Sequence, residues 1–364
     1  METIAASYEE VYCNSVVVRG DQPTDIAFAS CGGASTNFIY RNMDAAGSGT
    51  WQLVYESDAN VAAALALAPS DPNTIYAITT LLYSTGTLGA VLRSTSNGDN
   101  GSWQVRADSN SNGVAANILS LDPCNGGYGQ GIFNLAITVD PTNPNTVFVG
   151  GIELFRSDDG GVTWGSINAG DAHVDQHIFA FAPGYDGKSN QTLYVGNDGG
   201  VYFTNTALAA PEPACGGASP WGWHSMNNSF ATTQFYYGTS VPGGGTYFGG
   251  TQDNGTVVGT NAAGINGWHG IYGGDGGQVL VDPIDPNVRF ISQTNILNIQ
   301  KSSDGLQTYS PSINGLTESN SDYQWAYYYT FDPSNSLTPL LGRDYSRVAQ
   351  HGRRKRLGGG ERAP

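Results

Sequence analysis

The feature that most constrains the fold of this chain is a short loop at residues 157–164, which has the pattern S-x-D-x-G-x-T-W. We call this motif the Asp box. Residues 302–309 repeat it, with Leu306 where a glycine is expected. Two looser copies, each two residues longer, lie at 42–51 and 94–103. Because a recurring loop indicates a recurring structural unit, the chain is predicted to be a repeat protein.

A second repeated element precedes the Asp boxes and has the pattern of a strand, a proline-locked turn and another strand. Copies occupy residues 65–76, 137–148 and 279–290, and a fourth begins at 329. After the copy at 137–148, a Gly-Gly turn, a third strand and the Asp box lead into a fourth strand. This order predicts a four-stranded blade of a β-propeller.

The predicted fold is therefore all-β: a single β-propeller of about seven four-stranded blades with Asp-box turns, the last blade being incomplete. Glycine supplies 50 of the 364 residues and charged residues only 13%, as expected for many short strands joined by tight turns. Residues 1–23 are assigned to an N-terminal strand or ring-closure segment and residues 24–345 to the propeller. The predicted blades span 24–56, 62–106, 134–168, 177–227, 234–271 and 277–313, with a seventh from about 326.

The end of the chain breaks this pattern, because a basic run follows Tyr345 where a third strand and an Asp box are due. Read one base out of frame, the codons of this run permit an Asp box. Residues 346–364 are therefore expected to be a frameshifted, disordered tail. Six of the fifteen Lys and Arg residues lie from Arg347 onward, so the propeller is more acidic than the whole chain.

Charge and hydropathy exclude several classes of function. The formal net charge of −16 argues against a nucleic-acid partner, because phosphate binding needs a basic surface. The sequence contains no run of about 18 apolar residues, so no membrane span is predicted. No signal peptide is recognisable in the chain, but its acidic, Lys-poor and Gly-rich composition is typical of a secreted bacterial protein. An extracellular location is therefore predicted.

The four cysteines are Cys13, Cys31, Cys124 and Cys215, and none has the C-x-x-C spacing of a zinc site. Cys13 and Cys31 flank two apolar runs with a turn midway between them. If these runs pair as a hairpin centred near Gln22, the two cysteines face each other. Two alternatives stay open: a Cys13–Cys31 disulfide, with Cys124–Cys215 paired by elimination, or four buried thiols.

With these motifs the chain resembles the Asp-box (BNR) repeat β-propellers, a group that includes sialidases, sortilin-like receptors and two-propeller xyloglucan-cleaving glycosidases. Residues 140–164 look most like the last two, and residues 24–345 look like secreted bacterial members that carry the strings at 173–177, 197–200 and 250–255. The arginine triad of sialidases is not matched, because Arg41, Arg93 and Arg156 directly precede Asp boxes. The early catalytic Asp motif of the xyloglucan enzymes is also missing.

The resemblance implies that Asp boxes lie on the propeller face opposite the usual ligand face. Asp159 and Asp304 are expected to accept hydrogen bonds within their own turns, while Trp164 and Tyr309 pack between strands. The residues assigned this structural role are Ser157, Asp159, Gly161, Thr163, Trp164, Ser302, Asp304, Thr308 and Tyr309.

The ligand face is expected at the turns between second and third strands and at the entries to innermost strands. Each Asp-Gly-Gly or Asp-Asn-Gly turn alone is ordinary turn chemistry. Together, the turns of blades four to six predict one polar surface. Its ligand-binding candidates are His173, Asp175, His177, Asp198, Gln234, Gln252, Asp253 and Asp275, and its catalytic candidates are Asp175, Asp198, Asp253 and Asp275.

The predicted function is binding of a polysaccharide or glycan. The alternatives are a xyloglucanase-like or sialidase-like glycoside hydrolase and a sortilin-like scaffold for a protein partner. No cofactor and no metal are predicted, although His173, Asp175 and His177 would share one side of an extended segment and could bind a cation. Aromatic residues at 235–237 and 325–329 are assigned mainly to core strands, with Trp221 and Trp223 more available for stacking on a sugar.

Overall fold

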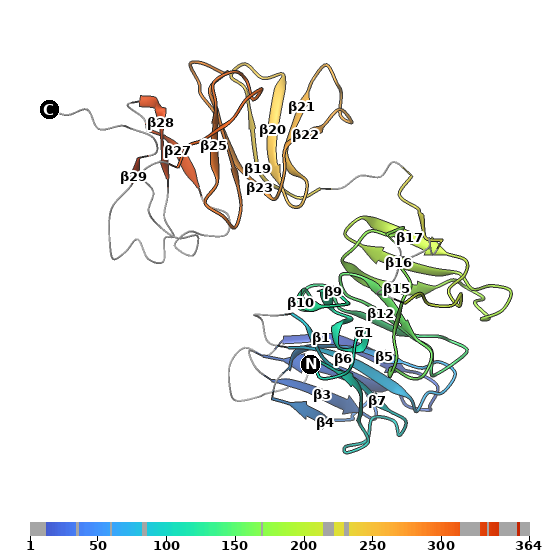
Figure 1. Ribbon diagram of the computed structural model, residues 1–364. Helices are drawn as coiled ribbons and strands as arrows, with labels where there is room; N and C mark the ends of the chain where they lie inside the picture. Colours follow the sequence, from blue (N-terminus) through green and yellow to red (C-terminus); the bar gives the residue numbers. More distant parts are fainter. Residues whose placement is uncertain are drawn as a thin grey trace. The chain divides into compact units, whose positions relative to one another are not determined.

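A computed structural model describes the protein (Figure 1). The described residues are 12–33, 36–58, 60–81, 86–168, 170–213, 222–228, 233–313, 328–332, 335–341 and 355–356. The chain forms two compact units, Met1–Phe230 and Ala231–Pro364, and each is treated by itself below. Within the described residues, no helix combines the length and the apolar composition that crossing a membrane requires.

The first unit contains four antiparallel sheets of four strands each, and in every sheet the strands pair in chain order. The first sheet is β1 (Tyr12–Arg19), β2 (Ile26–Gly32), β3 (Asn37–Asn42) and β4 (Trp51–Ser57), and the second is β5 (Asn60–Leu67), β6 (Ile75–Leu81), β7 (Leu88–Ser94) and β8 (Gln104–Asp108). The third is β11 (Ala136–Val139), β12 (Val147–Gly150), β13 (Leu154–Ser157) and β14 (Gly165–Ser166), and the fourth is β15 (Gln176–Phe181), β16 (Leu193–Asn197), β17 (Gly200–Thr204) and β18 (His224–Ser225). Helix α1 (Val114–Asn117) and the hairpin β9 (Ser120–Asp122) and β10 (Gly126–Gly129) come between the second and third sheets in the chain.

The second unit contains two further four-stranded sheets and one of three strands. The fifth sheet is β19 (Phe235–Ser240), β20 (Thr246–Thr251), β21 (Gly255–Thr260) and β22 (His269–Tyr272). The sixth is β23 (Gly276–Val281), β24 (Arg289–Gln293), β25 (Ile299–Ser302) and β26 (Ser310–Pro311), and the seventh is β27 (Tyr329–Asp332), β28 (Asn335–Leu341) and β29 (Lys355–Arg356).

These seven sheets confirm the predicted all-β propeller class, and the described residues of the last sheet form three strands. The first sheet begins earlier than residue 24, because β1 pairs along its length with β2. In the segment predicted to be a disordered tail, β29 pairs with β28. The other residues of 346–364 lie outside the described part of the chain.

The hydrophobic core lies between consecutive sheets. Within the first unit the innermost strands β1, β5, β11 and β15 contact one another in that order, and within the second unit β19 contacts β23. Phe28 and Ile39 of the first sheet pack in one cluster with Leu92 of the second, and Phe148 of the third sheet packs with Val195 of the fourth. Each such side chain contributes about 1.5–3 kcal/mol when fully buried, so stacking of sheets supplies the main stabilisation.

The predicted disulfide between Cys13 and Cys31 is confirmed. The two residues are direct partners in the register of β1 and β2, so their side chains leave the sheet at the same place. Cys124 is also disulfide-bonded. Its expected partner, Cys215, lies outside the described residues.

Arginines on the third strands reach from one sheet to the next at the end where the Asp boxes lie. Arg41 donates to the carbonyl of Asn97 and the carboxylate of Asp99, both at 2.6 Å. Arg93 donates to the Asn145 side chain at 2.8 Å. Because these guanidinium groups bond neighbouring loops, they make no arginine triad of the kind that sialidases use.

Arg156 is the most buried of these bridges. Its side chain is only 4% exposed, and Nη1 donates to the carbonyls of Ala207 and Ala209 in the loop that follows β17, both at 2.6 Å. Nε and Nη2 donate to the Asp158 carboxylate at 3.0 and 2.9 Å. One side chain thus joins an Asp-box loop to the next sheet.

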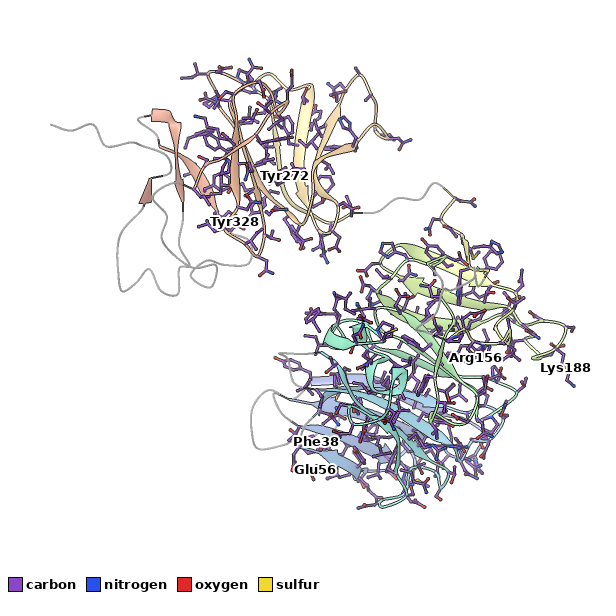
Figure 2. The ribbon with its side chains drawn as sticks, viewed as in Figure 1. Phe38, Glu56, Arg156, Lys188, Tyr272 and Tyr328 are labelled. Carbon is purple, nitrogen blue, oxygen red and sulfur yellow. A yellow bond between two sulfur atoms is a disulfide. The ribbon has the colours of Figure 1, made fainter. Side chains whose placement is uncertain are left out.

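Replacing Arg156 by Met should lower the free energy of unfolding by about 3 kcal/mol, because the buried Ala207 carbonyl and the Ala209 carbonyl lose their charged donor. Lys188→Met is the matched control, since Lys188 lies in an exposed loop of the same unit (Figure 2). Urea unfolding of both variants measures the effect. Equal midpoints for the two variants would contradict a bridging role for Arg156.

Candidate functional site

The Asp-box side chains are occupied within their own turns. The Asp159 carboxylate accepts hydrogen bonds from the backbone N–H groups of Val162 and Thr163 at 3.0 and 2.9 Å, and from the Thr163 hydroxyl at 2.7 Å. Trp164 donates its indole N–H to the Gly161 carbonyl at 3.0 Å and is buried. These groups are committed to the fold and are not available for a ligand.

The second Asp box has the same hydrogen bonds. Asp304 accepts from the backbone and hydroxyl of Thr308 and from Ser302, and these bonds lower the pKa of Asp304 to about 2. Leu306, which replaces the expected glycine, has a φ of 76°. The turn therefore keeps its left-handed residue even though a branched side chain makes that conformation costly.

The polar turns of the third and fourth sheets meet at the end opposite the Asp boxes. The backbone N–H of Asp175 donates to the Ile152 carbonyl at 3.0 Å, and that of Asp198 donates to the Asp175 carbonyl at 3.2 Å. Gln176 is fully buried and donates its amide to the His173 carbonyl at 2.7 Å. The segment before β15 is thus fixed between the β12–β13 turn and the β16–β17 turn.

Asp175 sits at the centre of this polar surface. Its φ is +66°, a left-handed conformation that aspartate tolerates better than most residues. One carboxylate oxygen accepts a hydrogen bond of 2.6 Å from the amide of Asn134, which also donates to Gln130 at 2.8 Å. Asn134 is only 3% exposed, so this amide holds the carboxylate from the buried side.

Glu153 lies next to this polar surface and is not among the residues predicted from the sequence. It lies in the β12–β13 turn, where its carboxylate accepts a hydrogen bond of 3.0 Å from Asn168. Burial raises the pKa of the Glu153 carboxyl, the Asn168 bond opposes this, and the negative charge of Asp175 adds to the increase. The Gly-Gly-x-Glu string at 150–153 could have indicated it, since the second-to-third turns were already assigned to the ligand face.

His177 and Asp198 form an exposed pair on the same surface. His177 Nε2 and Asp198 Oδ1 are 2.5 Å apart, and the two side chains are 46% and 35% exposed. The register of β15 and β16 skips His177, because Gln176 pairs with Asn197 and Ile178 with Gly196. This β-bulge turns the His177 side chain toward the carboxylate of the neighbouring turn.

The expectation that His173, Asp175 and His177 share one side of an extended segment is wrong. Residues 171–175 are bends rather than a strand, and β15 begins only at Gln176. His173 Nδ1 instead lies 2.9 Å from the Val174 carbonyl. Over the part of the chain that the structure describes, no three His, Cys, Asp or Glu side chains converge as metal ligands.

In the second unit the structure brings Asp253 and Asp275 together. The backbone N–H of Asp253 donates to Asp275 Oδ1 at 2.6 Å, and Asp253 has a φ of +56°. Gln252 donates its backbone N–H to the Gln234 carbonyl at 2.9 Å, which joins these two candidate residues through the main chain. Four of the eight predicted residues lie in each of the two units.

The exposure of two aromatic side chains, Trp223 and Phe133, differs from what the sequence predicts. Trp223 is only 4% exposed and donates its indole N–H to the Ile167 carbonyl at 2.6 Å, so the expectation that it is available for stacking on a sugar is wrong. Trp221 lies outside the described residues, as do residues 325–327. Phe133, which the sequence analysis did not single out, is 70% exposed and directly precedes Asn134.

Two shallow hollows lie on the fifth sheet, one of about 240 Å³ beside Asn261 and one of about 420 Å³ beside Phe235. They share Tyr247 and Trp268, and neither is lined by a carboxylate. Aromatic rings contribute to both hollows, which therefore differ in chemistry from the polar turns described above.

No protein-family model matches the sequence, and no curated protein matches it either. Among solved structures, the chain is similar to the GH74 enzyme of Niastella koreensis, with 17% identity over 91% of this chain and 50% of that chain and a TM-score of 0.40. The GH74 xyloglucanase of Xanthomonas campestris is 19% identical over 92% of this chain and 51% of that chain, with a TM-score of 0.37. YCF48 from Cyanidioschyzon merolae is 11% identical over 92% of this chain and 93% of that chain, with a TM-score of 0.35. The chain spans about half the length of the two GH74 enzymes that it matches.

These similarities concern the fold. Seven consecutive antiparallel sheets and the Asp-box turns define the class of the protein, a β-propeller of the Asp-box type.

Glu153→Gln should raise the free energy of unfolding at pH 7. A carboxyl whose pKa is raised on folding destabilises the native state when it is ionised, and falling pH relieves this penalty by protonation. The gain from the substitution should therefore shrink from pH 7 toward pH 4. Urea unfolding across this range measures it, and a loss of stability at pH 7 would contradict the assignment.

Proposed function

We propose that this protein binds a neutral glycan at the polar turns of the third and fourth sheets. The observation that carries the proposal is the exposed His177–Asp198 pair, with its 2.5 Å contact. This contact uses His177 Nε2 and Asp198 Oδ1, so the other ring nitrogen and the other carboxylate oxygen remain for a ligand. A sugar hydroxyl can donate to either atom, and it can accept from the ring nitrogen when that nitrogen carries a proton.

The surroundings of the pair favour an uncharged ligand. Asp175 and Asp198 make this surface acidic, and the whole chain has a formal net charge of −16, which disfavours anions. Both carboxylates are already bound by protein donors, Asn134 and His177, which reduces their capacity to bind a cation. Hydroxyl groups can use their remaining acceptor positions.

Phe133 adds an apolar contact to this polar surface. It is 70% exposed and adjoins Asn134, whose amide contacts Asp175. An exposed aromatic ring close in the chain to amide and carboxylate groups suits a pyranose, which presents C–H groups on its faces and hydroxyls at its edge. The Cys13–Cys31 disulfide is consistent with an oxidising, extracellular setting, where polysaccharides are encountered.

Binding is tested with four neutral polysaccharides, xyloglucan, mixed-linkage β-glucan, xylan and mannan, by affinity electrophoresis. At least one should retard the wild-type protein, and His177→Ala should weaken that binding about tenfold, equivalent to about 1.4 kcal/mol. Lys188→Ala is the matched surface control and should bind as the wild type does. Retardation by none of the four, or equal retardation of His177→Ala, would contradict the proposal.

A second candidate function is hydrolysis of the bound glycan, and the pKa of Glu153 favours it. A carboxyl with a raised pKa can donate a proton to a leaving oxygen, while the Asp175 carboxylate takes one from the attacking water. If this holds, the wild type should release reducing ends from the retained polysaccharide. Glu153→Gln should abolish release while leaving retardation intact. Retardation without release by the wild type would leave a binding protein.

A further inference from the structure

The innermost strands of the fourth and fifth sheets share a bulge at the same position. In β15 the extra residue is His177, between the pairs Gln176 with Asn197 and Ile178 with Gly196. In β19 the extra residue is Tyr236, because Phe235 pairs with Thr251 and Tyr237 with Gly250. Each bulged residue is the second of its strand and lies beside a turn that carries an aspartate. The fifth sheet thus repeats, with tyrosine, the position that holds His177 in the fourth.

The surroundings of Tyr236 are acidic. Burial, then the negative charge of Asp275, then that of Asp253, raise the pKa of Tyr236 to about 12. The phenol therefore keeps its proton at neutral pH and remains a hydrogen-bond donor. The backbone hydrogen bond from Asp253 to the Asp275 carboxylate holds both aspartates at the same corner.

Two buried hydroxyls border this corner, and neither has a hydrogen-bond partner among the described residues. They belong to Thr256, which is fully buried, and Thr294, which is 4% exposed. Thr294 donates its backbone N–H to the Asp275 carbonyl at 3.0 Å. Thr256 is the register partner of Gly250, whose backbone packs directly against Gly277 of the sixth sheet.

Buried hydroxyls without partners are rare in folded proteins because each costs about 1–3 kcal/mol. Thr294 is bonded to Asp275 through its backbone and Thr256 lies in β21 directly after the turn that carries Asp253, so the elements that form this corner contain two hydroxyls that the described residues leave unused. This observation is independent of the two carboxylates and of the bulge.

We infer that Tyr236, Asp253 and Asp275 form a second glycan-binding subsite, in which the phenol donates to a sugar hydroxyl and a carboxylate accepts from it. The inference rests on the proposed glycan binding and extends it to a second group of residues. The Tyr236 phenol is a hydrogen-bond donor beside the carboxylates of Asp253 and Asp275. This distinguishes the corner from a cation site, which would present oxygen acceptors alone. Tyr236 is thereby assigned as a specificity-determining residue.

The test uses the full chain, the same four polysaccharides and the variant Tyr236→Phe, which removes one oxygen atom. Binding of the retained polysaccharide should weaken about five- to tenfold, with the melting temperature unchanged. Tyr247→Phe is the matched control, because Tyr247 is a partly exposed tyrosine of the same sheet, and it should bind as the wild type does. Asp275→Asn provides a second variant and should also weaken binding.

The outcomes separate this inference from the proposal on which it rests. If the wild type and Tyr236→Phe are retarded equally while His177→Ala is not, the second subsite is overturned and glycan binding stands. If no polysaccharide retards the wild type, both are overturned. If Asp253 and Asp275 bind Ca²⁺ in a calorimetric titration and Tyr236→Phe leaves that unchanged, the corner is a cation site and the inference fails.

Discussion

The packing of one four-stranded sheet against the next is the constraint on which the rest of this structure depends. A single blade cannot bury both of its faces, so each must be covered by its neighbour. Within the first unit, aromatic and aliphatic side chains fill the spaces between the four sheets, and arginines such as Arg156 join their edges. Removing one such contact therefore affects two blades at once.

The two ends of the sheets differ in how their polar side chains are used. At one end, the Asp boxes and the third-strand arginines use their hydrogen bonds within the fold, as Asp159 and Arg156 illustrate. At the other end, the connecting segments carry carboxylates, amides and a histidine that remain partly exposed. The rigid end thus supports the end that we propose to bind a ligand. A site placed on turns gains precision from the sheets beneath it.

The sequence predicted the features that depend on local residue patterns. The Asp-box turns, the blade order and the opposition of Cys13 and Cys31 all follow from short-range spacing, and the register of β1 and β2 confirms the last of these. From the second blade onward, the predicted blade boundaries agree with those of the observed sheets within a few residues. The first blade was placed too late because β1 precedes the first recognisable repeat.

Features that depend on register or on contacts between sheets were not predictable. The bulges at His177 and Tyr236 appear only once the strands are paired, and no local motif announces them. Asn134 and Glu153 gain their roles from Asp175, which is distant in the sequence from Asn134. The supposed alternation of His173, Asp175 and His177 failed because the left-handed turn at Asp175 interrupts the extended backbone.

The central claim is that the end opposite the Asp boxes recognises sugar hydroxyls, and a crystal structure with an oligosaccharide of the retained polysaccharide tests it most directly. The account predicts a sugar hydroxyl within about 3 Å of both His177 and Asp198, with a pyranose face against Phe133. An oligosaccharide bound at the Asp-box end, or held without any contact to His177 and Asp198, would contradict it.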